Sequence, residues 1–115
     1  MGNVSDLTFL KTFTAGDSGK VKKYVGMFLN MAGPSLTQMD QSCQSQDWKS
    51  LKTTSHSLKS QMKYMGMAEA AAVAQKIEDI CGNSSGLESI PELLSRLQSL
   101  VQAAVIELQD EIDKL

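Results

Sequence analysis

The fold class of this chain follows from residues 89–115, which read SIPELLSRLQSLVQAAVIELQDEIDKL. Apolar residues in this stretch recur every three or four positions, which is the spacing of one face of an α-helix. This stripe consists of Leu93, Leu97, Leu100, Val101, Ala104, Val105, Leu108, Ile112 and Leu115. Ser89-Ile90-Pro91-Glu92 matches a capping box, and the proline falls in the first turn, where its missing N–H costs nothing. The pattern predicts a helix of roughly seven turns that begins at Ser89.

The preceding segment, Ala68–Cys81, has the same helical spacing. Its many alanines allow neighbouring helices to approach closely. The residues expected to face inward are Ala70, Val73, Ala74, Ile77 and Ile80. Gly82-Asn83-Ser84-Ser85-Gly86 is expected to end this helix, because glycine and asparagine favour turns.

A further helix is predicted over Trp48–Met65, with Asp47 as its N-cap and Gly66 at its end. One stripe of this helix is apolar except at a single serine, and we expect it to be buried. It consists of Trp48, Leu51, Ser55, Leu58, Met62 and Met65.

The first part of the chain predicts one long helical segment and one short one. The long segment, Gly19–Gln46, is interrupted by Gly33-Pro34, so we expect either a kink or two consecutive helices with one direction. Its inward residues are Val21, Val25, Phe28, Leu29, Ala32, Leu36, Met39 and Cys43. A short helix is expected from Ser5 or Asp6 to Phe13, ending before the Gly16-Asp17-Ser18-Gly19 turn. Its expected inward residues are Leu7 and Leu10, with Phe9 and Phe13 as further candidates for that side.

These segments predict an all-α protein. Strand signals are nearly absent, because no alternating apolar and polar run is bounded by turn residues. Long helices joined by short loops pack antiparallel. We therefore expect an antiparallel up-down four-helix bundle with a short extra N-terminal helix, formed as a single domain by residues 1–115.

The composition is that of an ordinary globular domain, with 42% hydrophobic and 21% charged residues. The formal net charge of −2 gives no reason to expect nucleic-acid binding. No stretch is apolar enough to span a membrane, and the first residues lack the regions of a secretory signal. We expect a cytoplasmic monomer. Cys43 and Cys81 are expected to be reduced core thiols, with a single disulfide left open. A metal site is poorly supported, because one histidine without clustered cysteines or carboxylates falls short of a ligand set.

The only histidine, His56, lies in a second stripe of the Trp48–Met65 helix, beside the apolar one. The other members of this stripe are Lys49, Lys52, Lys59 and Lys63. Lysines at this spacing make the neighbourhood attractive to an anion. A neutral imidazole is also a competent nucleophile near pH 7. Phosphate handling is therefore the hypothesis that the residues themselves suggest.

His56-Ser57-Leu58-Lys59-Ser60, with Gly66 ten residues after the histidine, resembles the signature of histidine-containing phosphotransfer (HPt) domains. In that family the pattern is His, any residue, Leu, Lys, then Gly or Ser, and Gly at that spacing. The resemblance covers nearly the whole chain. Its other parts are Thr8-Phe9-Leu10-Lys11 with Gly16-Asp17, the Phe28-Leu29 helix with its proline, Asp47-Trp48 and Ile77-Glu78.

The resemblance implies that His56 is the phosphoacceptor. Lys59, one turn later on the same face and expected at the surface, would neutralise the phosphoryl oxygens. Ser60 would be the small residue that lets a partner's loops approach, and Gly66 would end the helix and allow the tight turn that follows. Glu78 stands where some members of the family have a glutamine that hydrogen-bonds the histidine. A glutamate there would accept a proton from a ring nitrogen and fix the tautomer, but its charge would be unfavourable near a phosphohistidine.

Some other residues near His56 are expected to help a partner protein bind. Lys52 and Lys63 would contribute to the local field at a partner's acidic surface, whereas Lys49 is expected to be only solvated. Met65 and Met67 are candidates for a partly exposed apolar docking rim.

The resemblance implies a phosphorelay intermediate that exchanges its phosphoryl group with an aspartate of a response-regulator receiver domain, free or within a hybrid sensor histidine kinase. The chain needs no cofactor of its own, and Mg²⁺ is expected in the partner receiver. No nucleotide-binding loop is present, so we predict a phosphocarrier without autokinase activity. The alternative is a non-catalytic helical adaptor that binds a receiver or other partner through the same face.

Overall fold

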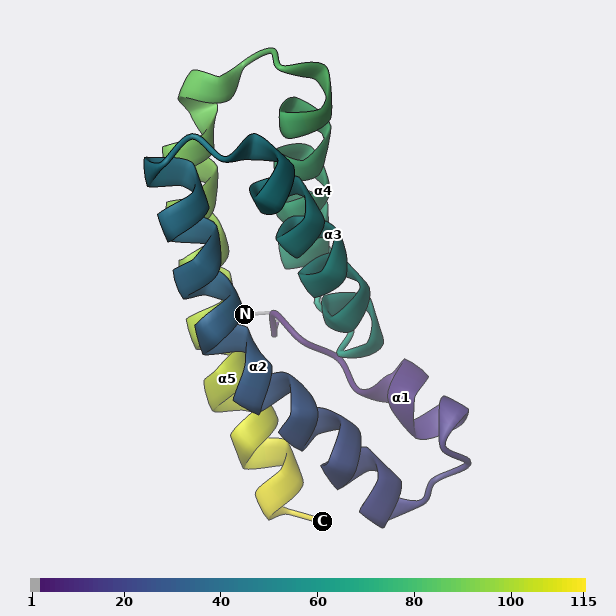
Figure 1. The fold of residues 1–115 in the computed structure, drawn as a ribbon. Coiled ribbons are helices and arrows are strands. Elements are labelled where there is room, and N and C mark those ends of the chain that lie inside the picture. Colours follow the sequence, from purple (N-terminus) through teal and green to yellow (C-terminus); the bar gives the residue numbers. More distant parts are fainter. Residues whose placement is uncertain (1–2) are drawn as a thin grey trace.

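The computed structural model describes residues 3–115, and its regular elements are helical throughout (Figure 1). They are α1 (Thr8–Phe13), α2 (Ser18–Gln44), α3 (Trp48–Tyr64), α4 (Ala68–Asn83), the 3₁₀ turn η1 (Leu87–Ser89) and α5 (Ile90–Asp113). No strand is found in this part of the chain. The predicted all-α class and the short extra N-terminal helix are confirmed.

The four long helices form an antiparallel bundle, as predicted. In Figure 1, α2 and α4 run in one direction, and α3 and α5 run in the other. Each helix packs against two others, because α3 contacts α2 and α4 while α5 also contacts α2 and α4. Both α2 and α5 extend beyond the turn that joins α3 to α4, and α1 lies at that end of the bundle (Figure 1).

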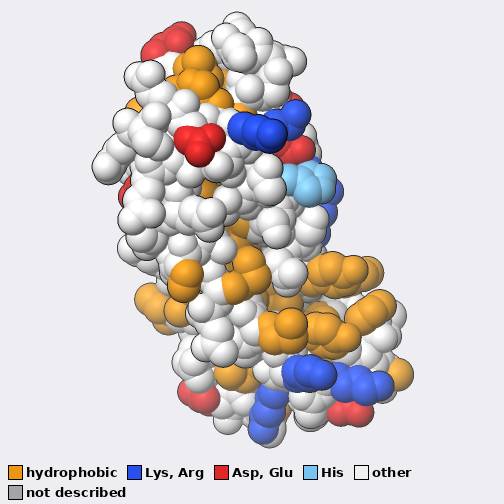
Figure 2. Space-filling model, in the orientation of Figure 1, with side chains coloured by type: hydrophobic (Ala, Val, Ile, Leu, Met, Phe, Trp, Pro, Cys, Tyr) orange, Lys and Arg blue, Asp and Glu red, His pale blue; other side chains and the backbone are white. Residues whose placement is uncertain are grey.

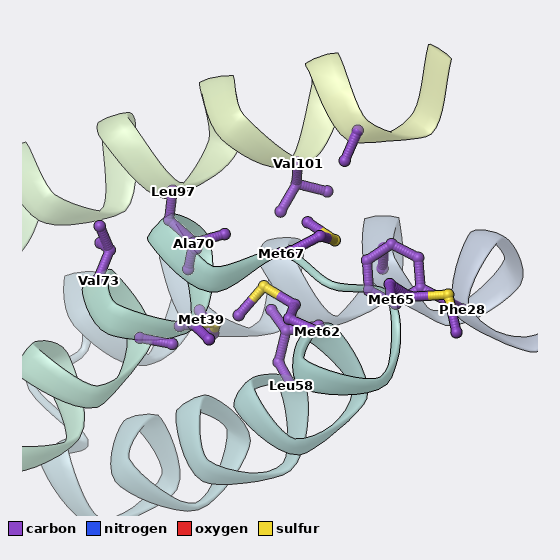
Figure 3. Packing of buried hydrophobic residues seen from close by; sticks show 14 of the residues in the cluster. Phe28, Met39, Leu58, Met62, Met65, Met67, Ala70, Val73, Leu97 and Val101 are labelled. Atoms are coloured by element: carbon purple, nitrogen blue, oxygen red, sulfur yellow. The ribbon is translucent and has the colours of Figure 1, made fainter. Parts of the chain in front are cut away.

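The interior of the bundle is filled by apolar side chains from all four long helices. Figure 3 shows Phe28 of α2, Met62 of α3 and Val101 of α5 in this core. Met65 and Met67 are also buried there, so the prediction that they form an exposed docking rim is wrong. The turn between α3 and α4 directs both thioethers inward, and Met65 lies beside Phe28. These methionines fill the core at the end of the α3–α4 pair.

The cap of α3 is the one predicted. Asp47 Oδ1 accepts a hydrogen bond from the Ser50 backbone N–H at 3.1 Å, and its Oδ2 accepts one from the Ser50 hydroxyl at 2.8 Å. The capping box predicted for α5 is wrong, because the Ser89 side chain makes no cap hydrogen bond. Ser89 has helical φ and ψ angles of −81° and −16°, whereas a capping serine normally has an extended backbone. Pro91 lies in the first turn of α5, as expected.

Helix α2 runs through Pro34 as one helix, so of the two predicted alternatives, a kink or two consecutive helices, the second is wrong. Pro34 removes only one backbone donor. The buried Ala32 and Met39 hold the helix against the core on both sides of it. Asp17 caps its start by accepting a hydrogen bond from the Lys20 backbone N–H at 3.1 Å.

The N-terminal strap, which we define as residues 3–7, lies over the end of the bundle instead of beginning α1. The backbone N–H groups of Val4 and Ser5 both donate to the Glu107 carboxylate of α5 at 2.9 Å, and the Ser5 hydroxyl donates to it at 2.6 Å. The Asp6 N–H donates to the Met65 carbonyl at 3.1 Å. The first backbone bond of α1 runs from the Lys11 N–H to the Leu7 carbonyl, so α1 begins at Thr8 and not at Ser5 or Asp6 as predicted.

Helix α1 buries Leu10, and Leu7 before it is also buried, as expected. The expectation that Phe9 and Phe13 also face inward is wrong, because both rings are more than half exposed. A helix of six residues has only one face toward the core, and the two phenylalanines share another face at i and i+4.

Both cysteines are free thiols; Cys81 is buried and Cys43 is partly buried. Burial raises the pKa of each thiol above its ordinary value. The described helices include none with a stretch long and apolar enough for a membrane span.

Candidate functional site

His56 lies on the outer face of α3, about the middle of the helix. Leu51 and Leu58 are fully buried, and this register turns the histidine toward solvent. Its side chain is 61% exposed. In Figure 2 the single histidine is visible on the surface of the bundle.

Glu78 of α4 holds one edge of the imidazole ring. Its Oε2 atom lies 3.0 Å from Nδ1 of His56. Ile77, next to it in the sequence, is fully buried and fixes the rotation of α4 against α3. Within residues 3–115 the other ring nitrogen, Nε2, has no hydrogen-bond partner. The ring is therefore oriented from one side and open to a partner on the other.

Lys59 is not the exposed lysine that the sequence predicts. Its side chain is only 9% exposed, and its Nζ atom donates to Gln75 Oε1 at 2.6 Å and to Glu78 Oε1 at 2.8 Å. The ammonium therefore points into the α3–α4 interface. The reason is that α4 presents two side-chain acceptors, three residues apart, where α3 passes closest.

The Glu78 carboxylate thus bridges two side chains of α3, with one oxygen on His56 and the other on Lys59. The hydrogen bond from Lys59 is the largest influence on its pKa. Together with the hydrogen bond to His56, it keeps that pKa below the ordinary value although burial opposes the shift. Glu78 is therefore ionised near neutral pH. Its charge is compensated by the ammonium of Lys59.

An ionised carboxylate can only accept a hydrogen bond, so the proton of a neutral imidazole must be on Nδ1. The lone pair then lies on Nε2, the nitrogen that faces solvent. The arrangement of His56 and Glu78 is that of an oriented nucleophile.

Gln75 belongs to this site and was not identified from the sequence. It accepts the Lys59 hydrogen bond through Oε1, and its Nε2 atom donates to Asp79 Oδ1 at 2.8 Å, which fixes the orientation of the amide. The available signal was its position three residues before Glu78, on a helix whose other inward residues are apolar.

The remaining lysines of the stripe do not converge on the imidazole. Lys52 is exposed and extends toward α4, where a Cβ atom on Gly82 would lie 3.3 Å from its Nζ atom. Lys63 is exposed on the far side of Ser60 and lines a groove with Phe9 and Tyr64. Only Lys59 is joined to the histidine through a shared partner.

Ser60 and Gly66 occupy the positions that the motif predicts for small residues. Ser60 is exposed, and its hydroxyl donates to the His56 carbonyl at 3.3 Å, so it stays close to the helix. Gly66 has a φ of +65° and ends α3. A Cβ atom there would lie 1.9 Å from the Asp6 carbonyl oxygen. Gly66 therefore serves the close passage of the N-terminal strap as well as the turn.

No group of three or more histidine, cysteine, aspartate or glutamate side chains that could hold a metal ion occurs among the described residues.

The family model of the Hpt domain matches residues 23–115. The chain belongs to the Hpt domain family. Hpt domains serve histidine phosphotransfer in two-component phosphorelays, as phosphocarriers that interact with receiver domains and kinases. Searches of curated proteins and of solved structures gave no significant match. The matched region of this Hpt domain contains α3, α4 and α5, and begins after α1 and the first residues of α2.

Proposed function

We propose that this Hpt domain is a phosphorelay intermediate that carries a phosphoryl group on Nε2 of His56 and exchanges it with an aspartate of a receiver domain. The observation that carries the proposal is the 3.0 Å contact between Nδ1 of His56 and Glu78 on a ring that is otherwise exposed. It makes Nε2 the nucleophilic atom and leaves it accessible to a partner.

The transfer step involves one bond made and one bond broken. The Nε2 lone pair attacks the phosphorus of the receiver's aspartyl phosphate, and the P–O bond to the aspartate breaks as its carboxylate leaves. The proton stays on Nδ1, so the product ring is positively charged and is stabilised by the Glu78 carboxylate. The reverse step returns the phosphoryl group, and the protonated ring is then the leaving group. The partner contributes the aspartate and Mg²⁺.

Lys59 has two roles in this proposal. It holds Glu78 through one N–H and Gln75 through a second. An ammonium has three N–H donors, so one remains for a phosphoryl oxygen on the adjacent histidine. Lys52 and Lys63 are proposed to act only through the field at an acidic partner surface.

The direct test is phosphotransfer from a panel of phosphorylated receiver domains of the same genome. The wild type is expected to become labelled by at least one receiver, with a phosphoryl bond that is labile in acid and stable in alkali, and His56→Gln is expected to stay unlabelled. Incubation with ATP and Mg²⁺ alone should give no label. If the wild type binds a receiver and is never labelled, the chain is an adaptor and the proposal is wrong.

The role of Glu78 has its own test. Glu78→Leu leaves Nδ1 of His56 without an acceptor, so the neutral ring is no longer held with its proton on Nδ1 and fewer molecules carry the free lone pair on Nε2. We expect transfer to slow by roughly 10- to 100-fold. Imidazole ¹⁵N spectra should show the proton mainly on Nδ1 in the wild type and a shift toward Nε2 in the variant. The matched control is Glu88→Leu, at an exposed glutamate of η1, which should change neither the rate nor the spectra.

A further inference from the structure

The hydroxyl of Ser60 lies one helical turn after His56 on the exposed face of α3. The motif accepts either glycine or serine at this position, so the space that a partner needs there does not require a hydroxyl. Within the described residues the hydroxyl makes one hydrogen bond, a long one of 3.3 Å to the His56 carbonyl. Because that bond is exposed to solvent, the hydroxyl can turn to another acceptor at little cost in free energy.

The contact with Glu78 decides on which side of the ring a phosphoryl group stands. Nδ1 of His56 faces α4, because its partner Glu78 belongs to that helix. The two nitrogens of an imidazole point in nearly opposite directions. Nε2 is therefore directed away from α4, and a phosphoryl group bonded to it extends toward the opposite side of α3.

Ser60 is on that opposite side of α3. Successive residues of a helix are rotated by about 100°, so Lys59 and Ser60 fall on opposite sides of His56. Lys59 lies on the side of α4, where its ammonium is buried. Ser60 lines a groove with Phe9 of α1 and with Tyr64. Its hydroxyl therefore borders the side of the histidine that a phosphoryl group occupies.

The direction of the side chain along the helix also favours Ser60. Side chains of a helix lean toward its N-terminus, and residues four apart are neighbours, with Cβ atoms about 5–6 Å apart. The Ser60 hydroxyl leans back toward His56 and reaches its carbonyl oxygen. Thr53, on the preceding turn, leans away from His56, and its hydroxyl donates to the Lys49 carbonyl at 3.1 Å. Of these two hydroxyls, that of Ser60 is the one directed at the histidine.

A phosphoryl group on Nε2 needs a donor on this side, because the two lysines one turn from His56 are directed toward α4. Lys59 uses two of its three N–H groups on Gln75 and Glu78. Lys52 extends toward Gly82 of α4. A hydroxyl that donates to a charged phosphoryl oxygen forms a stronger hydrogen bond than one that donates to a backbone carbonyl.

We propose that the Ser60 hydroxyl turns from the His56 carbonyl and donates a hydrogen bond to a phosphoryl oxygen on Nε2 of His56. The inference rests on the proposed function. It assigns a phosphate-binding residue that the motif itself does not require, because glycine at this position has no side-chain donor. Lys59 and Ser60 then hold the phosphoryl group from the two sides of the ring. The hydrogen bond stabilises the phosphorylated state and so shifts the transfer equilibrium toward this chain.

Three variants separate the hydroxyl of Ser60 from the size of its side chain. Ser60→Ala removes the hydroxyl and keeps the position small. Ser60→Thr keeps a hydroxyl, on a side chain that can also bond the carbonyl four residues before it. The matched control is Ser57→Ala, which removes an exposed hydroxyl directly after His56, since adjacent residues of a helix do not face each other.

The phosphohistidine is formed with two donors. Phosphoramidate is a small molecule that needs no docking surface, and ammonia leaves as the N–P bond to Nε2 forms. The second donor is the receiver that labels the wild type in the panel. The ³¹P resonance of the phosphohistidine is recorded after labelling by either donor, and the receiver also gives the equilibrium ratio of phosphorylated chain to phosphorylated receiver. Binding of the unphosphorylated chain to the receiver is measured separately, because it reports access alone.

We expect Ser60→Ala to shift the equilibrium about 5- to 10-fold toward the phosphorylated receiver and to move the ³¹P resonance, with receiver binding unchanged. Ser60→Thr should keep the wild-type ratio and resonance, and Ser57→Ala should match the wild type in all three measurements. A wild-type ratio and resonance in Ser60→Ala would overturn the inference and leave the proposed function intact. A loss confined to receiver binding would also overturn it, because Ser60 then serves only access.

The remaining outcomes separate the inference from the proposed function. If phosphoramidate labels the wild type and no receiver does, the proposed function fails, and the ³¹P resonance of Ser60→Ala still decides the inference. If neither donor labels the wild type, both fail. If Thr53→Val changes the resonance and Ser60→Ala does not, the hydrogen bond belongs to Thr53 and the inference is overturned.

Discussion

Replacing Lys59 with methionine removes the ammonium from the α3–α4 interface and keeps a side chain of similar length. In the wild type this ammonium is bonded to Gln75 at 2.6 Å and to Glu78 at 2.8 Å. Hydrogen bonds to charged groups contribute about 1.5–3 kcal/mol, whereas an exposed ion pair contributes at most about 1 kcal/mol. Methionine recovers part of the loss by burying apolar surface. We expect the free energy of unfolding at pH 7 to fall by about 2 kcal/mol.

The stability that Lys59→Met loses should depend on pH, because the partner of the ammonium is the carboxylate of Glu78. Lys59 holds the pKa of Glu78 below its ordinary value of 4.5 in the folded protein. The stability linked to this lowered pKa is fully present above the unfolded value and is lost as the pH falls through the folded one. In Lys59→Met the pKa of Glu78 rises. The difference in unfolding free energy between wild type and variant should therefore narrow below about pH 4.

The assay is urea unfolding followed by circular dichroism at pH 7 and at several values down to pH 3. A double-mutant cycle with Glu78→Gln should give a coupling energy of about 1–2 kcal/mol at pH 7. The matched control is Lys63→Met, on the same helix and exposed, which should change stability by less than about 0.5 kcal/mol. If Lys59→Met lowers the free energy of unfolding by no more than Lys63→Met does, the ammonium is not held in the interface and the assignment of Lys59 is refuted.

Three further changes test the packing around the site. Gly66→Ala should lower the free energy of unfolding by about 2 kcal/mol or more, because the added Cβ atom meets the strap at 1.9 Å and φ is +65°. In urea unfolding Gly26→Ala in α2 is its control, because no heavy atom outside the helix backbone and the two chain neighbours lies within 4 Å of the added Cβ; this variant should be neutral or stabilising. Ser55→Ala should leave the melting temperature equal or higher, because the buried hydroxyl has no partner within the described residues; a fall would reveal one. Burial raises the pKa of Glu107, but hydrogen bonds from the Ser5 hydroxyl and the strap N–H groups bring it below the ordinary value. Glu107→Gln should therefore lower the free energy of unfolding by about 1 kcal/mol at pH 7, and the difference from the wild type should shrink at low pH. A difference that stays constant with pH would contradict the role of the ionised Glu107 in holding the strap.

Much of the bundle could be predicted because it depends on features that repeat along the chain. The three- and four-residue spacing of α3 correctly assigns Leu51, Leu58 and Met62 to the core. The same spacing assigns His56 to the outer face, where its side chain is exposed. Asp47 shows that a helix end is predictable where the capping residue has the backbone conformation that a cap needs. Ser89 shows the opposite, because its helical φ and ψ come from a 3₁₀ turn that the sequence pattern does not reveal.

The sequence by itself determined the helices, the orientation of α3 and the histidine at its centre, because these follow from periodicity within one helix. Tertiary structure alone decided the environment of the residues at the border between the buried and exposed faces. Periodicity gives the angle of Lys59 around α3 but not the acceptors that α4 places there, so an expected surface lysine became the buried partner of Glu78. Likewise α1 is too short for its own pattern to orient both of its faces. In the folded chain Leu10 is buried, whereas the exposed rings of Phe9 and Phe13 lie against Tyr64 of α3 and Tyr24 of α2.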